Sequence, residues 1–162
     1  MSKSNSRPLI IDDEIPDISG RTDEGTPISL ADFNGRALAV FFTGRALERI
    51  EITMLKNLKR RVDEFLEFEC SPVVVSMASE DVLASVREAE DLPFLLISDV
   101  DGAIHESVNG GKTEEAIGSW LVNDEGKIVS AIPPMPPREQ VSATVAALSR
   151  IVARPGGSQS DT

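Results

Sequence analysis

Apolar residues in this chain form short runs of strand length, separated by stretches in which they recur every three or four residues. The run 37–42 is continuous and apolar; a turn signal at 34–36 precedes it and Thr43-Gly44 ends it. The next apolar positions are Leu47, Ile50, Met54, Leu58, Val62 and Phe65. This spacing predicts a buried strand followed by a long helix over about 45–67, with one stripe facing inward.

The same patterns predict the remaining elements. Short apolar runs at 9–11, 15–19 and 27–30 predict a small amino-terminal hairpin, and residues 31–33 a single helical turn. Further strands are expected at 72–77, 94–97, 117–122 and 127–132. Helices are expected after Ser79, a candidate N-cap, and at 103–108 and 138–153. The inward positions of the helix after Ser79 are Val82, Leu83, Val86 and Ala89.

This order predicts an α/β fold. A β–α–β–α–β core indicates a central, mainly parallel sheet with helices on both faces, and the carboxy-terminal hairpin adds an antiparallel edge. We expect disordered residues 1–7, one domain over 8–153 and a disordered tail over 154–162. A chain of 162 residues is long enough for one sizeable core.

Composition and charge narrow the classes of partner. The net charge is −11, which opposes binding to nucleic acid or to anionic membranes and favours a basic protein partner. No apolar run is long enough to cross a bilayer and no secretory signal is visible, so a cytoplasmic location is expected. One Cys and one His exclude an internal disulfide and any CxxC site, and neither a metal nor a cofactor is expected.

Several segments in order resemble the peroxiredoxins, the alkyl hydroperoxide reductase/thiol-specific antioxidant family of the thioredoxin fold. Residues 15–17 and 25–35 are similar to the family's opening "P-D-F" and "G-x-x-x-S-L-x-D-F-x-G". Residues 92–102 are similar to "L-P-F-P-L-L-S-D-P-D-G", and residues 120–128 to "F-V-I-D-x-D-G-K-I". The resemblance implies a thioredoxin-like fold with a central mixed sheet flanked by helices and an amino-terminal β-hairpin extension. It also implies a homodimer.

The family's catalytic motif does not match. Peroxiredoxins carry "P-x-x-x-T-x-x-C" directly after the core strand, and those positions fall here on Thr43, Leu47 and Ile50. The family's activating Arg falls near Ile117 and is also missing. The resemblance therefore implies a member that has lost thiol peroxidase activity.

The remaining reactive side chains have ordinary structural interpretations. Cys70 is the only thiol; it precedes a strand at the end away from the expected crevice, with Glu67 and Glu69 nearby, which would raise its pKa. We interpret it as a structural cysteine and His105 as a structural or solvent-facing histidine. Asp99 and Asp101 fit a turn better than a calcium loop, because the other ligands of such a loop are missing.

The strand-to-helix corner is the candidate ligand site. Thr43, Gly44, Arg45 and Arg49 could place two guanidinium groups beside the backbone N–H groups of a helix start, which suits a carboxylate or phosphate. The alternative is that both arginines pair with neighbouring acidic residues.

We therefore expect a binding or accessory module that acts on a protein partner. Two alternatives stay open. One is a thiol-dependent oxidoreductase that acts through Cys70. The other is a non-redox enzyme that uses the 43–49 corner.

Overall fold

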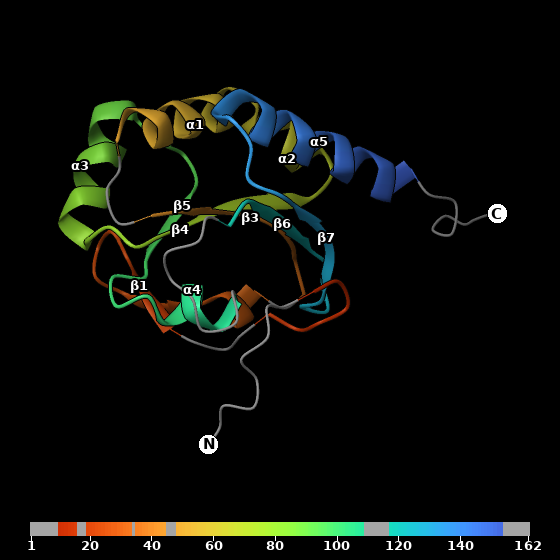
Figure 1. Ribbon diagram of the computed structural model, residues 1–162, viewed down its shortest axis with the longest axis horizontal. Helices are drawn as coiled ribbons and strands as arrows, with labels where there is room; N and C mark the ends of the chain where they lie inside the picture. Colours follow the sequence, from red (N-terminus) through yellow and green to blue (C-terminus); the bar gives the residue numbers. More distant parts are fainter. Residues whose placement is uncertain (1–9, 16–18, 34, 45–47, 109–116, 154–162) are drawn as a thin grey trace, which may run out of the picture.

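A computed structural model describes residues 10–15, 19–33, 35–44, 48–108 and 117–153 of the chain (Figure 1). The strands are β1 (Ser19–Thr22), β2 (Pro27–Ser29), β3 (Ala37–Thr43), β4 (Cys70–Ser76), β5 (Leu95–Ser98), β6 (Ser119–Val122) and β7 (Ile128–Ile132). The helices are η2 (Leu30–Phe33), a 3₁₀ turn, and α1 (Arg49–Arg60), α2 (Val62–Glu67), α3 (Glu80–Glu90), α4 (Ala103–Val108) and α5 (Pro137–Ala153).

The strands form one seven-stranded sheet in the order β2-β1-β5-β4-β3-β6-β7. The central strands β3, β4 and β5 are parallel, because helices connect them. Strands β1, β6 and β7 join them in antiparallel pairs at the two sides. The predicted thioredoxin-like mixed sheet, flanked by helices and extended by an amino-terminal hairpin, is confirmed.

Both faces of the sheet are covered, so its central strands are apolar throughout. Helices α1, α2, α3 and α5 lie over one face, and α4 lies over the other (Figure 1). Side chains of β3 alternate between two buried clusters: Ala39 and Phe41 belong to the first, and Leu38, Val40 and Phe42 to the second. This two-sided burial explains why the sequence shows a continuous apolar run here instead of an alternating one.

The predicted long helix over 45–67 is wrong in two respects. It is divided at Arg61, whose backbone (φ −111°, ψ 12°) ends α1 and begins α2. Met54, Leu58 and Phe65 are buried as predicted, but Ile50 is 66% exposed, since it lies in the first turn of α1, before that helix reaches the core. Residues 45–47, Leu47 among them, lie outside the described residues.

Two further expectations need correction. Ile10 and Ile11 are exposed and form no strand; the segment that follows instead bonds to β7, through the amide of Asp12 and the carbonyl of Ile128 (2.8 Å). On α3, Val82 and Ala89 face solvent, while Leu83 is buried and Val86 half-buried. Ser79 caps this helix as predicted, accepting a hydrogen bond from the amide of Val82. The termini 1–7 and 154–162 lie outside the described residues.

An ion pair attaches the amino-terminal hairpin to the helix layer. The carboxylate of Asp23, in the β1–β2 turn, accepts hydrogen bonds from Nε and Nη2 of Arg87 on α3 at 2.6 and 3.1 Å. The Asp23 side chain is only 7% exposed, and hydrogen bonding to Arg87 lowers its pKa although burial acts in the opposite direction. The pair links two segments that are 64 residues apart.

Candidate functional site

The carboxyl ends of the three parallel strands carry a row of hydroxyl groups. Thr43, Ser76 and Ser98 are the last residues of β3, β4 and β5, and the register places Thr43 beside Ser76 and Ser76 beside Ser98. All three are buried. Ligands of α/β folds usually bind beside the carboxyl ends of the parallel strands, so this row of hydroxyl groups is a candidate position for a site.

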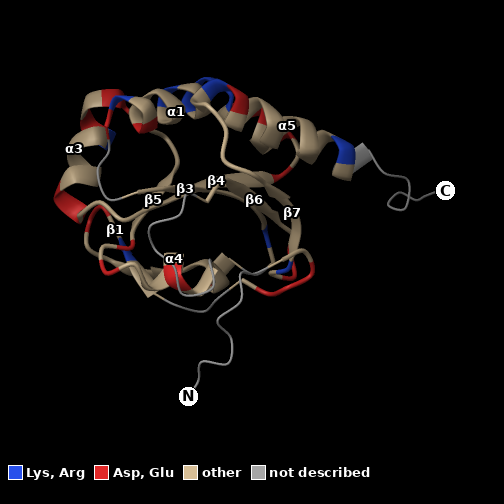
Figure 2. Cartoon of the chain, in the orientation of Figure 1, with Lys and Arg blue, Asp and Glu red and all other residues tan. Residues whose placement is uncertain are grey.

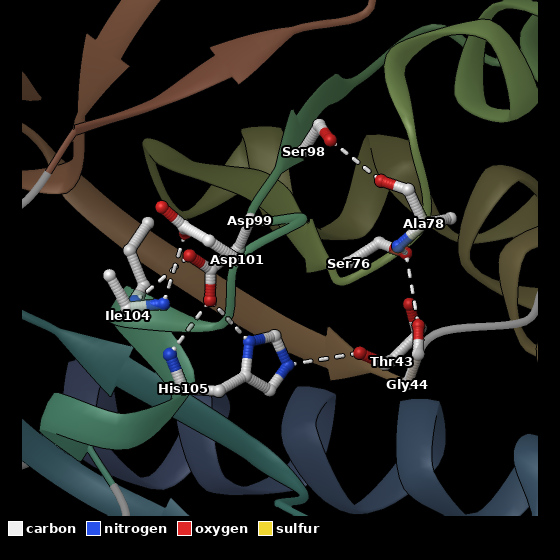
Figure 3. Close-up of polar contacts among 10 residues, drawn as sticks. Thr43, Gly44, Ser76, Ala78, Ser98, Asp99, Asp101, Ile104 and His105 are labelled. Atoms are coloured by element: carbon white, nitrogen blue, oxygen red, sulfur yellow. Dashed lines mark hydrogen bonds and ion pairs between the residues drawn. The ribbon is translucent and has the colours of Figure 1, made fainter. Parts of the chain in front are cut away.

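The hydroxyl groups of Ser76 and Ser98 form hydrogen bonds with the backbone of the loops that follow the strands (Figure 3). The Ser76 hydroxyl accepts a hydrogen bond from the amide of Ala78 at 3.0 Å and lies 3.4 Å from the carbonyl of Gly44. The Ser98 hydroxyl donates to the carbonyl of Ala78 at 2.6 Å. These bonds hold the backbone of the two loops in place beside the ends of the strands.

The Thr43 hydroxyl differs from them. Its Oγ1 atom is fully buried and has no hydrogen-bond partner among the described residues. A buried polar atom without a partner costs about 1–3 kcal/mol. Thr43 is also the first residue of the predicted ligand corner, so this corner begins with a buried hydroxyl group to which no described residue bonds.

A buried pair of titratable groups lies beside Thr43. The Asp99 carboxylate caps α4: Oδ1 accepts from the amide of Ile104 at 2.9 Å and Oδ2 from the amide of His105 at 2.8 Å. The same Oδ2 lies 2.7 Å from Nδ1 of His105. The other ring nitrogen, Nε2, lies 2.9 Å from the carbonyl oxygen of Thr43 (Figure 3).

The imidazole ring of His105 connects two elements. One ring nitrogen contacts the carboxyl group of Asp99 and the other contacts the carbonyl of Thr43, so the ring links α4 to the end of β3. Asp99 and His105 are 1% and 4% exposed, so these contacts are shielded from water. The sequence interpretation of His105 as structural fits this position. The sequence did not reveal its partners, although an Asp before a short helix whose first turn contains the only His was a usable signal.

The predicted ligand corner is only partly described. Thr43 is buried, Gly44 and Arg49 are exposed, and Arg45 lies outside the described residues. The amino end of α1 is occupied by a capping box in which the Glu48 side chain accepts from the amide of Glu51 and the Glu51 carboxylate accepts from the amide of Glu48. The capping box therefore uses the amides of Glu48 and Glu51 and places two carboxylates at the helix start, which oppose the binding of an anion there.

The thiol lies at the other end of the sheet. Cys70 begins β4 beside Ala37, six residues before Ser76, or about 20 Å along the strand. Its side chain is 1% exposed, and burial raises the pKa of the thiol to about 12. The expectation of a raised pKa is confirmed, but the cause is burial and not the nearby glutamates. Within the described residues, no group of three His, Cys, Asp or Glu side chains could hold a metal ion.

The sequence is similar to one protein family and to proteins that are named as peroxiredoxins. Residues 11–131 match the AhpC/TSA family. The chain is 30% identical over 117 residues to the Mycobacterium tuberculosis protein named "Putative peroxiredoxin Rv2521", covering 67% of this chain and 74% of the relative. It is 22% identical over 128 residues to "Peroxiredoxin Bcp" of Bacillus subtilis, covering 74% and 82%.

Solved structures show the same fold. The crystal structure of Peroxidoxin BcpB from Mycobacterium tuberculosis superposes with a TM-score of 0.79 at 18% identity, covering 88% of this chain and 98% of that one. AhpC of Enterococcus faecalis superposes with a TM-score of 0.71 at 21% identity, covering 90% and 95%.

Within the described residues, no helix is both long and apolar enough to cross a membrane.

Proposed function

Because the chain belongs to the AhpC/TSA family, whose chemistry is that of thiol peroxidases, we propose that it is a member that does not reduce peroxides and acts instead as a binding or accessory module. The observation that carries this proposal is Ile50. When the family motif "P-x-x-x-T-x-x-C" is placed from Thr43, its reactive cysteine falls on Ile50. Ile50 lies in the first turn of α1, and it is 66% exposed. An isoleucine has no thiol to oxidise.

The only thiol of the chain does not replace the missing one. Cys70 is buried about 20 Å from the corner, and a pKa of about 12 leaves almost no thiolate at neutral pH. The thiolate is the species that attacks a peroxide, so burial and protonation both oppose a reaction. This argument weakens the alternative of an oxidoreductase that acts through Cys70.

A partner protein would meet a mixed surface at the corner. Glu48, Arg49 and Ile50 are all exposed there. Figure 2 shows acidic residues along α3, which begins at the same end of the parallel strands. An exposed isoleucine supplies apolar contact area, and the acidic residues favour a basic partner. A homodimer stays part of the proposal.

The direct test is intact mass after brief exposure to a few equivalents of hydrogen peroxide with a sulfenic-acid trap. We expect no trapped adduct within minutes. The Cys70→Ser variant is the control, because the four methionines can also gain oxygen. A rapid adduct that disappears in Cys70→Ser would overturn the proposal and restore the oxidoreductase alternative.

The Ile50→Cys variant asks whether the corner still activates a thiol. We expect its introduced thiol to react with peroxide no faster than free cysteine, because the Glu48 and Glu51 carboxylates at this end of the helix oppose a thiolate. A reaction a hundredfold faster than free cysteine would mean that the corner keeps its catalytic environment, and that the loss of activity rests on one residue.

A further inference from the structure

A cavity of about 590 Å³ opens at the amino ends of β3 and β4, far from the corner described above. It lies between the sheet and the helices α2 and α5. Its volume falls within the range of about 300–1,000 Å³ that is usual for small-molecule sites. It is open to solvent on one side, where exposed residues such as Arg36 and Glu69 line it.

The inner walls are apolar. Leu121 on β6 and Val129 on β7 form the sheet side, Phe68, Leu148 and Ile151 form the helix side, and Cys70 lies at the start of β4. Leu121, Leu148 and Cys70 are buried, and the other three are partly buried. The cavity is therefore an open end of the larger core cluster, and an apolar molecule there would complete the packing of that core.

The mouth carries a hydrogen-bond donor with spare capacity. Nη1 of Arg36 donates to the hydroxyl of Ser71 at 2.7 Å, which holds the guanidinium across the start of β4. Arg36 is exposed and its guanidinium carries five N–H groups, so groups other than the one bonded to Ser71 can donate to an acceptor on a ligand.

The charges at the mouth select against an ionised ligand. Glu69 and Asp124 line it together with Arg36, and both carboxylates are exposed. The sum of the three charges is −1, and the whole chain carries −11, so an anionic head would be repelled. A cationic head would have to lie beside the Arg36 guanidinium, which already occupies the mouth.

We propose that this cavity binds an uncharged lipophilic molecule with a single oxygen acceptor in its head, such as an alcohol or a ketone. The apolar body lies between Leu121 and Leu148, and Arg36 donates to the head oxygen. The inference does not depend on the proposed function, because the two sites lie at opposite ends of β3 and β4.

Isothermal titration tests the proposal, with 1-decanol below its solubility limit and with decanoate and decylammonium below their critical micelle concentrations. We expect 1-decanol to bind at least tenfold more tightly than either ion and to raise the melting temperature. Absence of 1-decanol binding would overturn the proposal, and equal affinity for the three compounds would overturn the assignment of the head group.

Two variants locate the site. Ile151→Trp fills the cavity and should reduce 1-decanol affinity at least tenfold, while Val82→Trp, on the exposed face of α3, should leave it unchanged. Arg36→Met keeps the walls intact and should lower the affinity severalfold, which provides an answer even if Ile151→Trp does not fold. Unchanged binding in both cavity variants would place the ligand elsewhere and overturn the inference. These binding results do not depend on whether the protein reacts with hydrogen peroxide, so the two proposals are tested separately.

Discussion

The Nε2 atom of His105 lies 2.9 Å from the carbonyl oxygen of Thr43, a residue 62 positions earlier in the chain. This contact joins α4, on one face of the sheet, to the last residue of β3, one of the three central parallel strands. Asp99 contacts the other ring nitrogen of His105 at 2.7 Å. The end of β3 is therefore held by a buried histidine that is itself held by Asp99.

His105→Ala should destabilise the protein by about 2–4 kcal/mol, because it removes a buried side chain and its contacts with the Asp99 carboxyl group and the Thr43 carbonyl. Urea unfolding at pH 7 measures the change. Glu106→Ala, at an exposed position of the same helix, is the control and should cost less than about 1 kcal/mol. A loss as small for His105→Ala would mean that the contacts of His105 do not hold the end of β3.

Thr43→Val should stabilise the protein by about 0.5–2 kcal/mol, because it replaces the unpartnered buried hydroxyl by a methyl group of similar size. The measurement is again the midpoint of urea unfolding. Ser98→Ala is the matched comparison and should destabilise, since the Ser98 hydroxyl donates a buried hydrogen bond. A destabilised Thr43→Val would indicate that the hydroxyl does have a partner in solution.

The Asp23–Arg87 pair predicts an acid-dependent loss of stability. Hydrogen bonding to Arg87 lowers the pKa of Asp23 below its ordinary value of 3.8 in the folded protein, so the pair stabilises fully above about pH 5 and its contribution falls as pH decreases through the folded pKa. Asp23→Asn should therefore destabilise by about 1–3 kcal/mol at pH 7, and the difference from the parent should shrink near pH 3.

Glu24→Gln changes an exposed neighbour in the same turn and controls for the general effect of charge on the acidic chain. Its difference from the parent should stay small at both pH values. If the difference in free energy of unfolding between Asp23→Asn and the parent is the same at pH 3 and pH 7, the ion pair is not the origin of the effect.

Alkylation of Cys70 should be slow in the native protein. A pKa near 12 leaves about 10³-fold less thiolate at pH 8 than the ordinary value of 9.0 would. We expect the iodoacetamide rate to rise about tenfold per pH unit between pH 8 and pH 10, and to match that of free cysteine in 6 M guanidinium. A rate in native protein that equals the denatured rate at pH 8 would show that the thiol is accessible.

Local patterns were enough to predict most of the fold. Strand β3 was found because both of its faces are buried, and the β6–β7 hairpin because its turn residues separate two apolar runs. The helical period also gave the inward positions Met54, Leu58 and Phe65. It failed for Ile50, because periodicity records which face of a helix is apolar but not where the neighbouring layer stops covering it.

The candidate site was less predictable, because its contacts are not local. The carbonyl that His105 contacts belongs to Thr43, which is 62 residues away. The absence of a thiol at the corner, in contrast, was predictable, because the number and position of cysteines are known from the sequence without any knowledge of the fold.

The hydrogen bonds between the segment after Ile11 and β7 affect how copies of this chain can associate. Strand β7 is the last strand of the sheet, and a bare outer strand is a template on which another chain can add and begin an aggregate. Here the amide and carbonyl of Ile128 already bond to Asp13 and Asp12, and Ile15 bonds to Gly126 in the adjoining turn. Deletion of residues 1–15 should expose this part of the edge and promote self-association through β7.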